Sequence, residues 1–96
     1  MVSKLKSPDV DNLFAAMLKL ETVEDCYIFF EDLCTAAEIK SMAQRLEVAK
    51  LLDRGDSYAD IARATGASTA TISRVKRYLN YGSDGYRLIL KRLKNS

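Results

Sequence analysis

Apolar residues recur along the chain at the spacing of helices, and signals for strands are weak throughout. Capping residues, one proline and the glycines divide the pattern into six predicted helices. The first helix is expected after Ser7, the second after Thr22, and the third from Thr35 to about Arg54. The fourth and fifth form a short pair within residues 57–79, and the sixth runs from after Ser83 to the end of the chain. A length of 96 residues fits one domain. The sequence therefore predicts an all-α fold with a single helical domain over residues 1–96.

The second predicted helix is apolar on most of its circumference. Its apolar residues are Val23, Cys26, Tyr27, Ile28, Phe29, Phe30 and Leu33. A surface helix keeps one polar face, so this helix is expected to be buried from several sides. A chain of this size buries only about 60–65% of the surface that it exposes when unfolded. A core shared with a second copy of the chain would supply the missing cover, and a homodimer is expected.

Residues 57–79 have the features of a helix-turn-helix. Ser57 is placed to cap a short helix, with Asp60 three residues later, where its carboxylate can accept from the backbone of the capping residue. Gly66 stands where that helix must end in a sharp turn, usually with positive φ. Ser68 is placed to cap the second helix, which packs inward through Ile72, Val75 and Leu79. A plain helical hairpin with a glycine turn is the alternative, but the agreement of all these features favours DNA binding.

The outward face of the second helix is small or polar. It consists of Ser68, Thr69, Ala70, Thr71, Ser73, Arg74 and Arg77, the candidate DNA-binding residues. Short hydroxyl and methyl groups can approach base edges, and Arg74 and Arg77 can reach guanine or phosphate. The amides at the start of the helix also favour a phosphate.

The charge is unevenly distributed although the net charge is only +2. Residues 1–34 sum to −4, residues 35–56 to zero, and residues 57–96 to +6. The C-terminal half is therefore either a footprint for a polyanion or a solvated basic surface. The basic residues of the last predicted helix are Arg87, Lys91, Arg92 and Lys94. They could touch phosphates beside the binding site, but a solvated helix face is the preferred interpretation.

Other classes of function find little support. Cys26 and Cys34 fit no metal-site spacing, the chain contains no histidine, and both thiols are expected to be reduced core residues in a reducing compartment. There is no apolar segment typical of a signal peptide or a membrane span, which predicts a cytoplasmic protein. No paired carboxylates or phosphate-binding glycine loop indicate an enzyme. No cofactor, metal site or catalytic residue is predicted.

Five runs between about Leu33 and Leu79 together form a characteristic pattern. They are Leu33-Cys34-Thr35, Gln44-Arg45, Leu51-Leu52-Asp53-Arg54-Gly55, Thr65-Gly66-Ala67 and Ala70-Thr71-Ile72-Ser73-Arg74, of which the last is the most specific. In these runs the chain resembles the Trp repressor superfamily. More closely, it is similar to the small bacterial Trp-repressor-related proteins of the YerC/YecD group.

The resemblance implies an intertwined homodimer in which the first, second, third and last helices form a shared core. The two recognition helices would enter successive major grooves about one helical turn (~34 Å) apart on a near-palindromic operator. The implied function is a sequence-specific transcriptional regulator that acts as a repressor. The alternative is a helical protein–protein interaction module that does not bind DNA.

The resemblance also marks a candidate effector pocket. Thr35, Arg45 and Arg74 match a threonine and two arginines that surround tryptophan in the Trp repressor. Val75 and Tyr78 depart from the family pattern because a glycine and a serine occupy these positions there. Both changes add bulk, which argues against tryptophan and leaves another small-molecule effector open. The preferred interpretation is that Arg45 pairs with a carboxylate of its own helix or of the partner chain, and that Arg74 contacts DNA.

Overall fold

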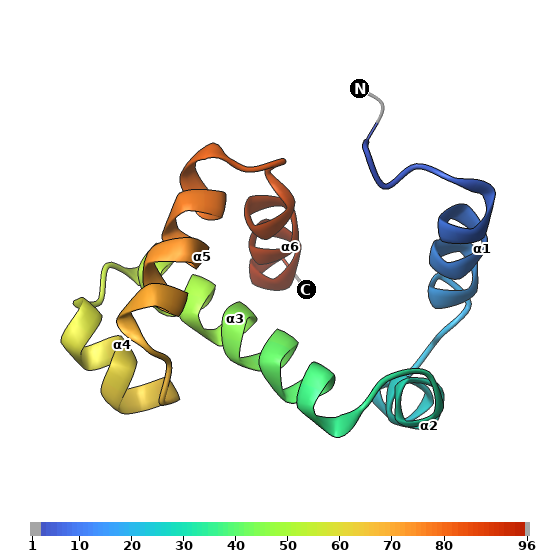
Figure 1. Cartoon of the computed structure of the whole chain (residues 1–96), viewed down its shortest axis with the longest axis horizontal. Helices are drawn as coiled ribbons and strands as arrows, with labels where there is room; N and C mark the ends of the chain where they lie inside the picture. The colour runs from blue at the N-terminus through green and yellow to red at the C-terminus, as the bar shows by residue number, and fades with distance from the viewer. Residues whose placement is uncertain (1–2, 96) are drawn as a thin grey trace. The chain divides into compact units, whose positions relative to one another are not determined.

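A computed structural model of the chain describes residues 3–95, which form six helices and no strand. The helices are α1 (Pro8–Met17), α2 (Val23–Leu33), α3 (Ala36–Arg54), α4 (Tyr58–Thr65), α5 (Thr69–Tyr81) and α6 (Gly85–Lys94) (Figure 1). The predicted all-α fold is confirmed. Met1, Val2 and Ser96, which the predicted domain and last helix include, lie outside the described residues.

The helix starts follow the predicted caps, with one exception. The Ser7 hydroxyl accepts from the Val10 amide, and the Thr22 hydroxyl accepts from the Asp25 amide, at 3.1 and 3.0 Å. The prediction that α6 follows Ser83 directly is wrong by one residue. Asp84 takes the capping position with a φ of 65°, in the left-handed region, and makes no side-chain capping hydrogen bond.

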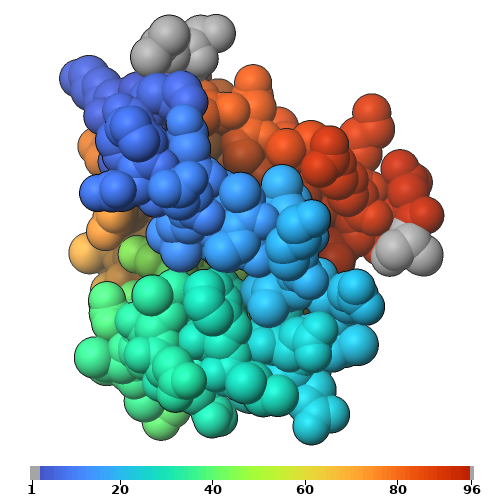
Figure 2. All heavy atoms as spheres, turned by 90° about the vertical axis from the view of Figure 1, so that its right-hand side faces the viewer, coloured from blue at the N-terminus to red at the C-terminus, as the bar shows by residue number. Residues whose placement is uncertain are grey.

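The chain divides into two compact units, residues 1–36 and residues 37–96. The first unit contains α1 and α2, and neither helix has a buried residue. The spheres of residues 3–36 run from blue to turquoise in Figure 2. Its large exposed apolar side chains within the helices and their ends are Phe14, Leu18, Val23, Tyr27, Ile28 and Leu33. The prediction that the second helix is buried from several sides is therefore wrong for a single chain.

The partly buried residues of α2 show that the first unit buries its own apolar side chains only in part. The rings of Phe29 and Phe30 meet edge to face, with centroids 5.3 Å apart, and both are half-buried. Cys26 and Cys34 are free thiols and also only half-buried, so they are not the core residues that the sequence predicted. Two helices of 10 and 11 residues offer too little surface to bury each other's apolar residues.

The second unit holds the hydrophobic core. Its buried residues are Val48, Ala49, Leu51, Ile61, Ala67, Ile72, Val75, Leu79 and Leu90. They come from α3 to α6 and from the turn between α4 and α5, while α4 packs against α5 and α5 against α6 (Figure 1). The predicted inward positions of α5 are confirmed. In α3 the core residues are Val48, Ala49 and Leu51, whereas Met42 of the same helix is exposed.

Candidate nucleic-acid interface

The turn between α4 and α5 requires a glycine. Gly66 ends α4 with a φ of 73°, and its amide donates to the carbonyl of Ala62 at 2.8 Å. This left-handed conformation is one that residues with a Cβ rarely adopt. No heavy atom lies within 4 Å of the position that a Cβ would take, so the backbone angle, and not lack of space, is the reason for glycine.

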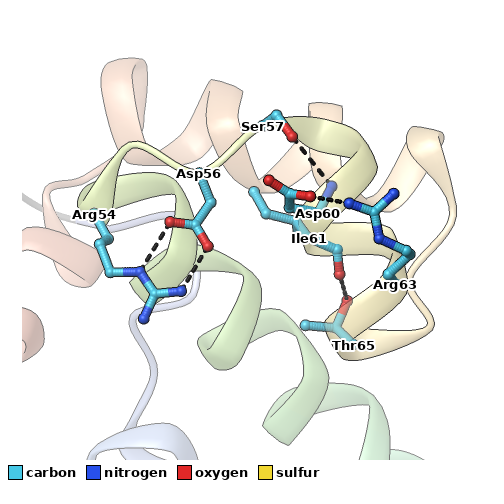
Figure 3. A network of polar contacts seen from close by, with 7 residues as sticks. All are labelled: Arg54, Asp56, Ser57, Asp60, Ile61, Arg63 and Thr65. Atoms are coloured by element: carbon cyan, nitrogen blue, oxygen red, sulfur yellow. Dashed lines mark hydrogen bonds and ion pairs between the residues drawn. The ribbon is translucent and has the colours of Figure 1, made fainter.

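Hydrogen bonds on both sides hold this turn against the second unit's core. The Thr65 hydroxyl donates to the carbonyl of Ile61 at 2.7 Å (Figure 3) and accepts from the amide of Ala67 at 3.1 Å. The Gln44 side-chain amide of α3 donates to the carbonyl of Thr65 at 3.1 Å. Because Ala67 is also buried, the direction in which α5 leaves the turn is fixed by contacts to α3 and α4.

Two ion pairs stabilise the start of α4 (Figure 3). The Ser57 hydroxyl accepts from the Asp60 amide at 3.1 Å, as predicted, but the Asp60 carboxylate accepts from the Arg63 guanidinium of its own helix. Just before α4, Arg54 donates to both carboxylate oxygens of Asp56, at 2.8 and 2.6 Å. The donated hydrogen bonds and the positive charge of Arg54 hold the pKa of Asp56 below its ordinary value.

The first turns of α5 present most of the predicted DNA-binding residues to the solvent. The Ser68 hydroxyl accepts from the Thr71 amide at 3.1 Å and donates to the Thr71 hydroxyl at 3.1 Å. Thr71 is half-buried, and the other six are exposed: Ser68, Thr69, Ala70, Ser73, Arg74 and Arg77. The cap thus uses the Thr71 hydroxyl within the helix, while its neighbours remain accessible.

The two arginines of this face lie beside an aromatic ring. The guanidinium carbons of Arg74 and Arg77 are 5.8 and 5.2 Å from the centroid of the Tyr78 ring, within the range of cation–π contacts. Neither arginine side chain forms an ion pair or hydrogen bond with another of residues 3–95. Their charges are therefore not neutralised by a carboxylate. Sequence reasoning missed this cluster, although the spacing of Arg74 and Tyr78, four residues apart on one helix, was a signal for it.

Two basic residues of α6 have partners on other helices of the second unit. Arg87 donates to the Asn80 side chain of α5 at 3.0 Å, and Lys94 donates to Asp53 of α3 at 2.8 Å. The hydrogen bond and charge of Lys94 hold the pKa of Asp53 below its ordinary value. Arg87 and Lys94 thus connect α6 to α5 and α3 at the surface of the second unit, which supports a structural use of that helix face.

The family model of the Trp repressor protein matches residues 8–94. The chain belongs to the Trp repressor family. It is 55% identical over 95 residues to the uncharacterized protein YerC of Bacillus subtilis strain 168, a match that covers 99% of this chain and 91% of that one.

Two solved structures match the Trp-repressor-like fold closely. A TrpR-like protein from Eubacterium eligens ATCC 27750 gives a TM-score of 0.92 at 56% identity, covering 95% of this chain and 94% of that chain. A candidate Trp repressor from Staphylococcus aureus gives a TM-score of 0.91 at 55% identity, covering 95% and 91%. Both matches cover 95% of this chain, so the six helices form a Trp-repressor-like fold.

Three residues match the effector pocket of the Trp repressor, and two of them belong to the second unit. Thr35 belongs to the first unit, while Arg45 of α3 and Arg74 of α5 belong to the second. The Arg45 side chain is half-buried and forms no hydrogen bond or ion pair with another described residue, so the carboxylate partner predicted on its own helix is absent. Val75 is 1% exposed and packs into the core, so its bulk serves helix packing.

An open, shallow apolar groove lies beside Tyr78 on the surface of the second unit. It has a volume of about 500 Å³ and is lined by Leu46, Tyr78, Ser83, Gly85, Tyr86 and Ile89. Arg45 and Arg74 are not among its lining residues. The effector pocket of Thr35, Arg45 and Arg74 therefore stays a prediction.

Among residues 3–95, no group of three or more potential metal ligands lies together. None of the described helices is long and apolar enough to cross a membrane.

Proposed function

We propose that this member of the Trp repressor family is a sequence-specific DNA-binding transcriptional regulator that acts as a repressor. The observation that carries the proposal is the exposed face of α5. It combines a capped helix start, small polar side chains and two arginines without a carboxylate partner. The opposite face of the same helix is buried through Ile72, Val75 and Leu79, so the exposed face is held outward.

The geometry of α5 suits the major groove of DNA. An α-helix fits that groove, and short side chains at its start let the backbone approach the base edges. The proposed contacts are made by Ser68, Thr69, Ala70, Thr71, Ser73, Arg74 and Arg77. Arg74 and Arg77 can each donate two hydrogen bonds to a guanine, while the capped start of the helix favours a phosphate.

A second copy of the chain would complete the fold. None of residues 3–36 of the first unit is buried, and both of its helices expose apolar side chains. We propose that α1, α2, α3 and α6 of two chains form one shared core, so that residues 1–96 act as a single domain within an intertwined homodimer. A twofold dimer carries two copies of α5 and reads a near-palindromic operator.

The proposed regulator does not use tryptophan as its corepressor. Tyr78, 45% exposed, brings an aromatic ring to within 5.8 Å of the Arg74 guanidinium, where the family pattern has a serine. The ring takes up space beside the arginine that the resemblance assigned to an effector.

A small molecule of other chemistry could still act on this protein, and no cofactor is needed for the proposed function. As a regulator of bacterial genes it would work in the cytoplasm.

The proposal predicts duplex binding with a steep dependence on salt. Each phosphate that a basic side chain neutralises contributes about −0.9 to the slope of log affinity against log salt concentration. We expect heparin and mixed-sequence duplex DNA to retain the protein at low salt, and fluorescence anisotropy at several salt concentrations to give a linear, negative slope. If neither polyanion binds the protein at low salt, the chain is better explained as a helical protein–protein interaction module.

A further inference from the structure

We infer that Tyr78 is a positioning residue that holds Arg74 and Arg77 ready for base readout. This inference rests on the proposed function of α5. Arg74 lies one helical turn before Tyr78, and Arg77 directly precedes it. Their guanidinium carbons stand 5.8 and 5.2 Å from the ring centroid, so one ring contacts both arginines of the proposed recognition face.

The position of Tyr78 is not explained by core packing. Its neighbours Val75 and Leu79 are buried, but Tyr78 is 45% exposed. An aromatic residue at a half-exposed position of a recognition helix leaves apolar surface in contact with water unless another group covers it. Here the two guanidinium groups lie against the ring, which is the arrangement that the negative face of an aromatic ring favours.

The ring is also the group that restrains the two arginines. The sequence of α5 contains no acidic residue, and no ion pair or hydrogen bond joins the side chain of Arg74 or Arg77 to another of the described residues. A free arginine side chain samples many rotamers, and this freedom is lost when it binds. Contact with Tyr78 limits the rotamers before binding, so less freedom is lost at the DNA surface.

Such restraint should act on sequence discrimination more than on general affinity. A bidentate contact to guanine requires a fixed direction of the planar guanidinium, whereas a phosphate accepts hydrogen bonds over a wide range of directions. The role belongs to the aromatic face and not to the hydroxyl. Phenylalanine should therefore replace tyrosine without loss, and a side chain of similar size without a π face should not.

The test compares Tyr78→Phe and Tyr78→Leu with the wild type and with Tyr81→Leu, a control at an 86% exposed tyrosine near the end of the same helix. The readout is the ratio of affinities for the preferred duplex and for random-sequence duplex at one salt concentration. Tyr78→Leu is expected to lower this ratio about fourfold to twenty-five-fold, since two exposed cation–π contacts contribute about two- to fivefold each and the two factors multiply. Tyr78→Phe and Tyr81→Leu should keep the wild-type ratio.

A second measurement assigns the effect to the arginines. In the Arg74→Ala/Arg77→Ala background, Tyr78→Leu should cause no further loss of the ratio, because the side chains that the ring positions are absent. Tyr78→Met, with the same expected loss, replaces Tyr78→Leu if circular dichroism shows that the leucine variant does not fold.

The outcomes separate this inference from the function on which it rests. If the wild type shows no preference for any duplex sequence, the proposed function itself fails. If the wild type discriminates but Tyr78→Leu or Tyr78→Met keeps the full ratio, the positioning role is overturned. An equal loss in Tyr78→Phe also overturns it, because that result assigns the effect to the hydroxyl.

Discussion

Replacing Arg74 by alanine should weaken binding to the preferred duplex by about 1–3 kcal/mol, where each 1.4 kcal/mol corresponds to a tenfold change in affinity. Arg74 is exposed in the middle of α5 and has no carboxylate partner among the described residues. It can therefore offer its full charge and both parallel N–H groups to a base. The loss should be larger for the preferred duplex than for random-sequence duplex, as measured by anisotropy titrations at one salt concentration.

Arg92→Ala is the matched control for this prediction. Arg92 is exposed on α6, carries the same charge and lies outside the proposed recognition face. Its removal should lower the affinity for both duplexes by a similar, small factor because only the general electrostatic attraction changes. The role given to Arg74 is wrong if Arg74→Ala and Arg92→Ala have the same effect on both duplexes.

The double variant Leu18→Glu/Ile28→Glu should turn a dimeric protein into a monomer. These side chains are 86% and 61% exposed in the single chain, so a charge at either position would be solvated at little cost there. In a core shared by two chains, each uncompensated charge would cost several kcal/mol. Light scattering should give the wild type a mass near twice 10.8 kDa and the variant a mass near 10.8 kDa.

Lys19→Glu controls for the change in charge. It alters the net charge by the same two units as the double variant, at an exposed polar position next to Leu18. Its mass should remain that of the wild type. A wild type that stays monomeric at all concentrations would rule out the shared core, and a double variant that stays dimeric would rule out the proposed interface.

Features decided within one helical turn could be predicted from the sequence. The caps of Ser7, Thr22, Ser57 and Ser68 and the positive φ of Gly66 depend on nearby residues only. The same holds for the inward positions of α5, which follow from helical periodicity. The start of α6 was misplaced because the left-handed Asp84 depends on the path of the whole loop.

Features that depend on distant contacts were predicted less well. The apolar pattern of α2 indicates a helix that needs cover, but it does not say which chain supplies the cover. The burial of Val48 and the hydrogen bond from Gln44 to Thr65 depend on which face α3 turns toward α4 and α5. Periodicity leaves that choice open where a helix is apolar on more than one side.

The candidate site shows the same division. Exposure along α5 followed from the pattern, apart from Thr71, whose hydroxyl accepts from Ser68 and is half-buried. The sequence marks Tyr78 only as a bulky residue at a position where the family pattern has a serine. Its contacts with Arg74 and Arg77 arise from side-chain rotamers, which the sequence does not specify.

Selection of bound duplexes from a random pool, with and without tryptophan, tests the central claim most directly. We predict enrichment of a near-palindromic sequence whose two half-sites are centred about one helical turn (~34 Å) apart, with the same sequence recovered in both conditions. Such a result would report recognition by α5, twofold symmetry and independence from tryptophan together. A pool that shows no enriched sequence after repeated rounds, from protein shown to be folded, would contradict the account.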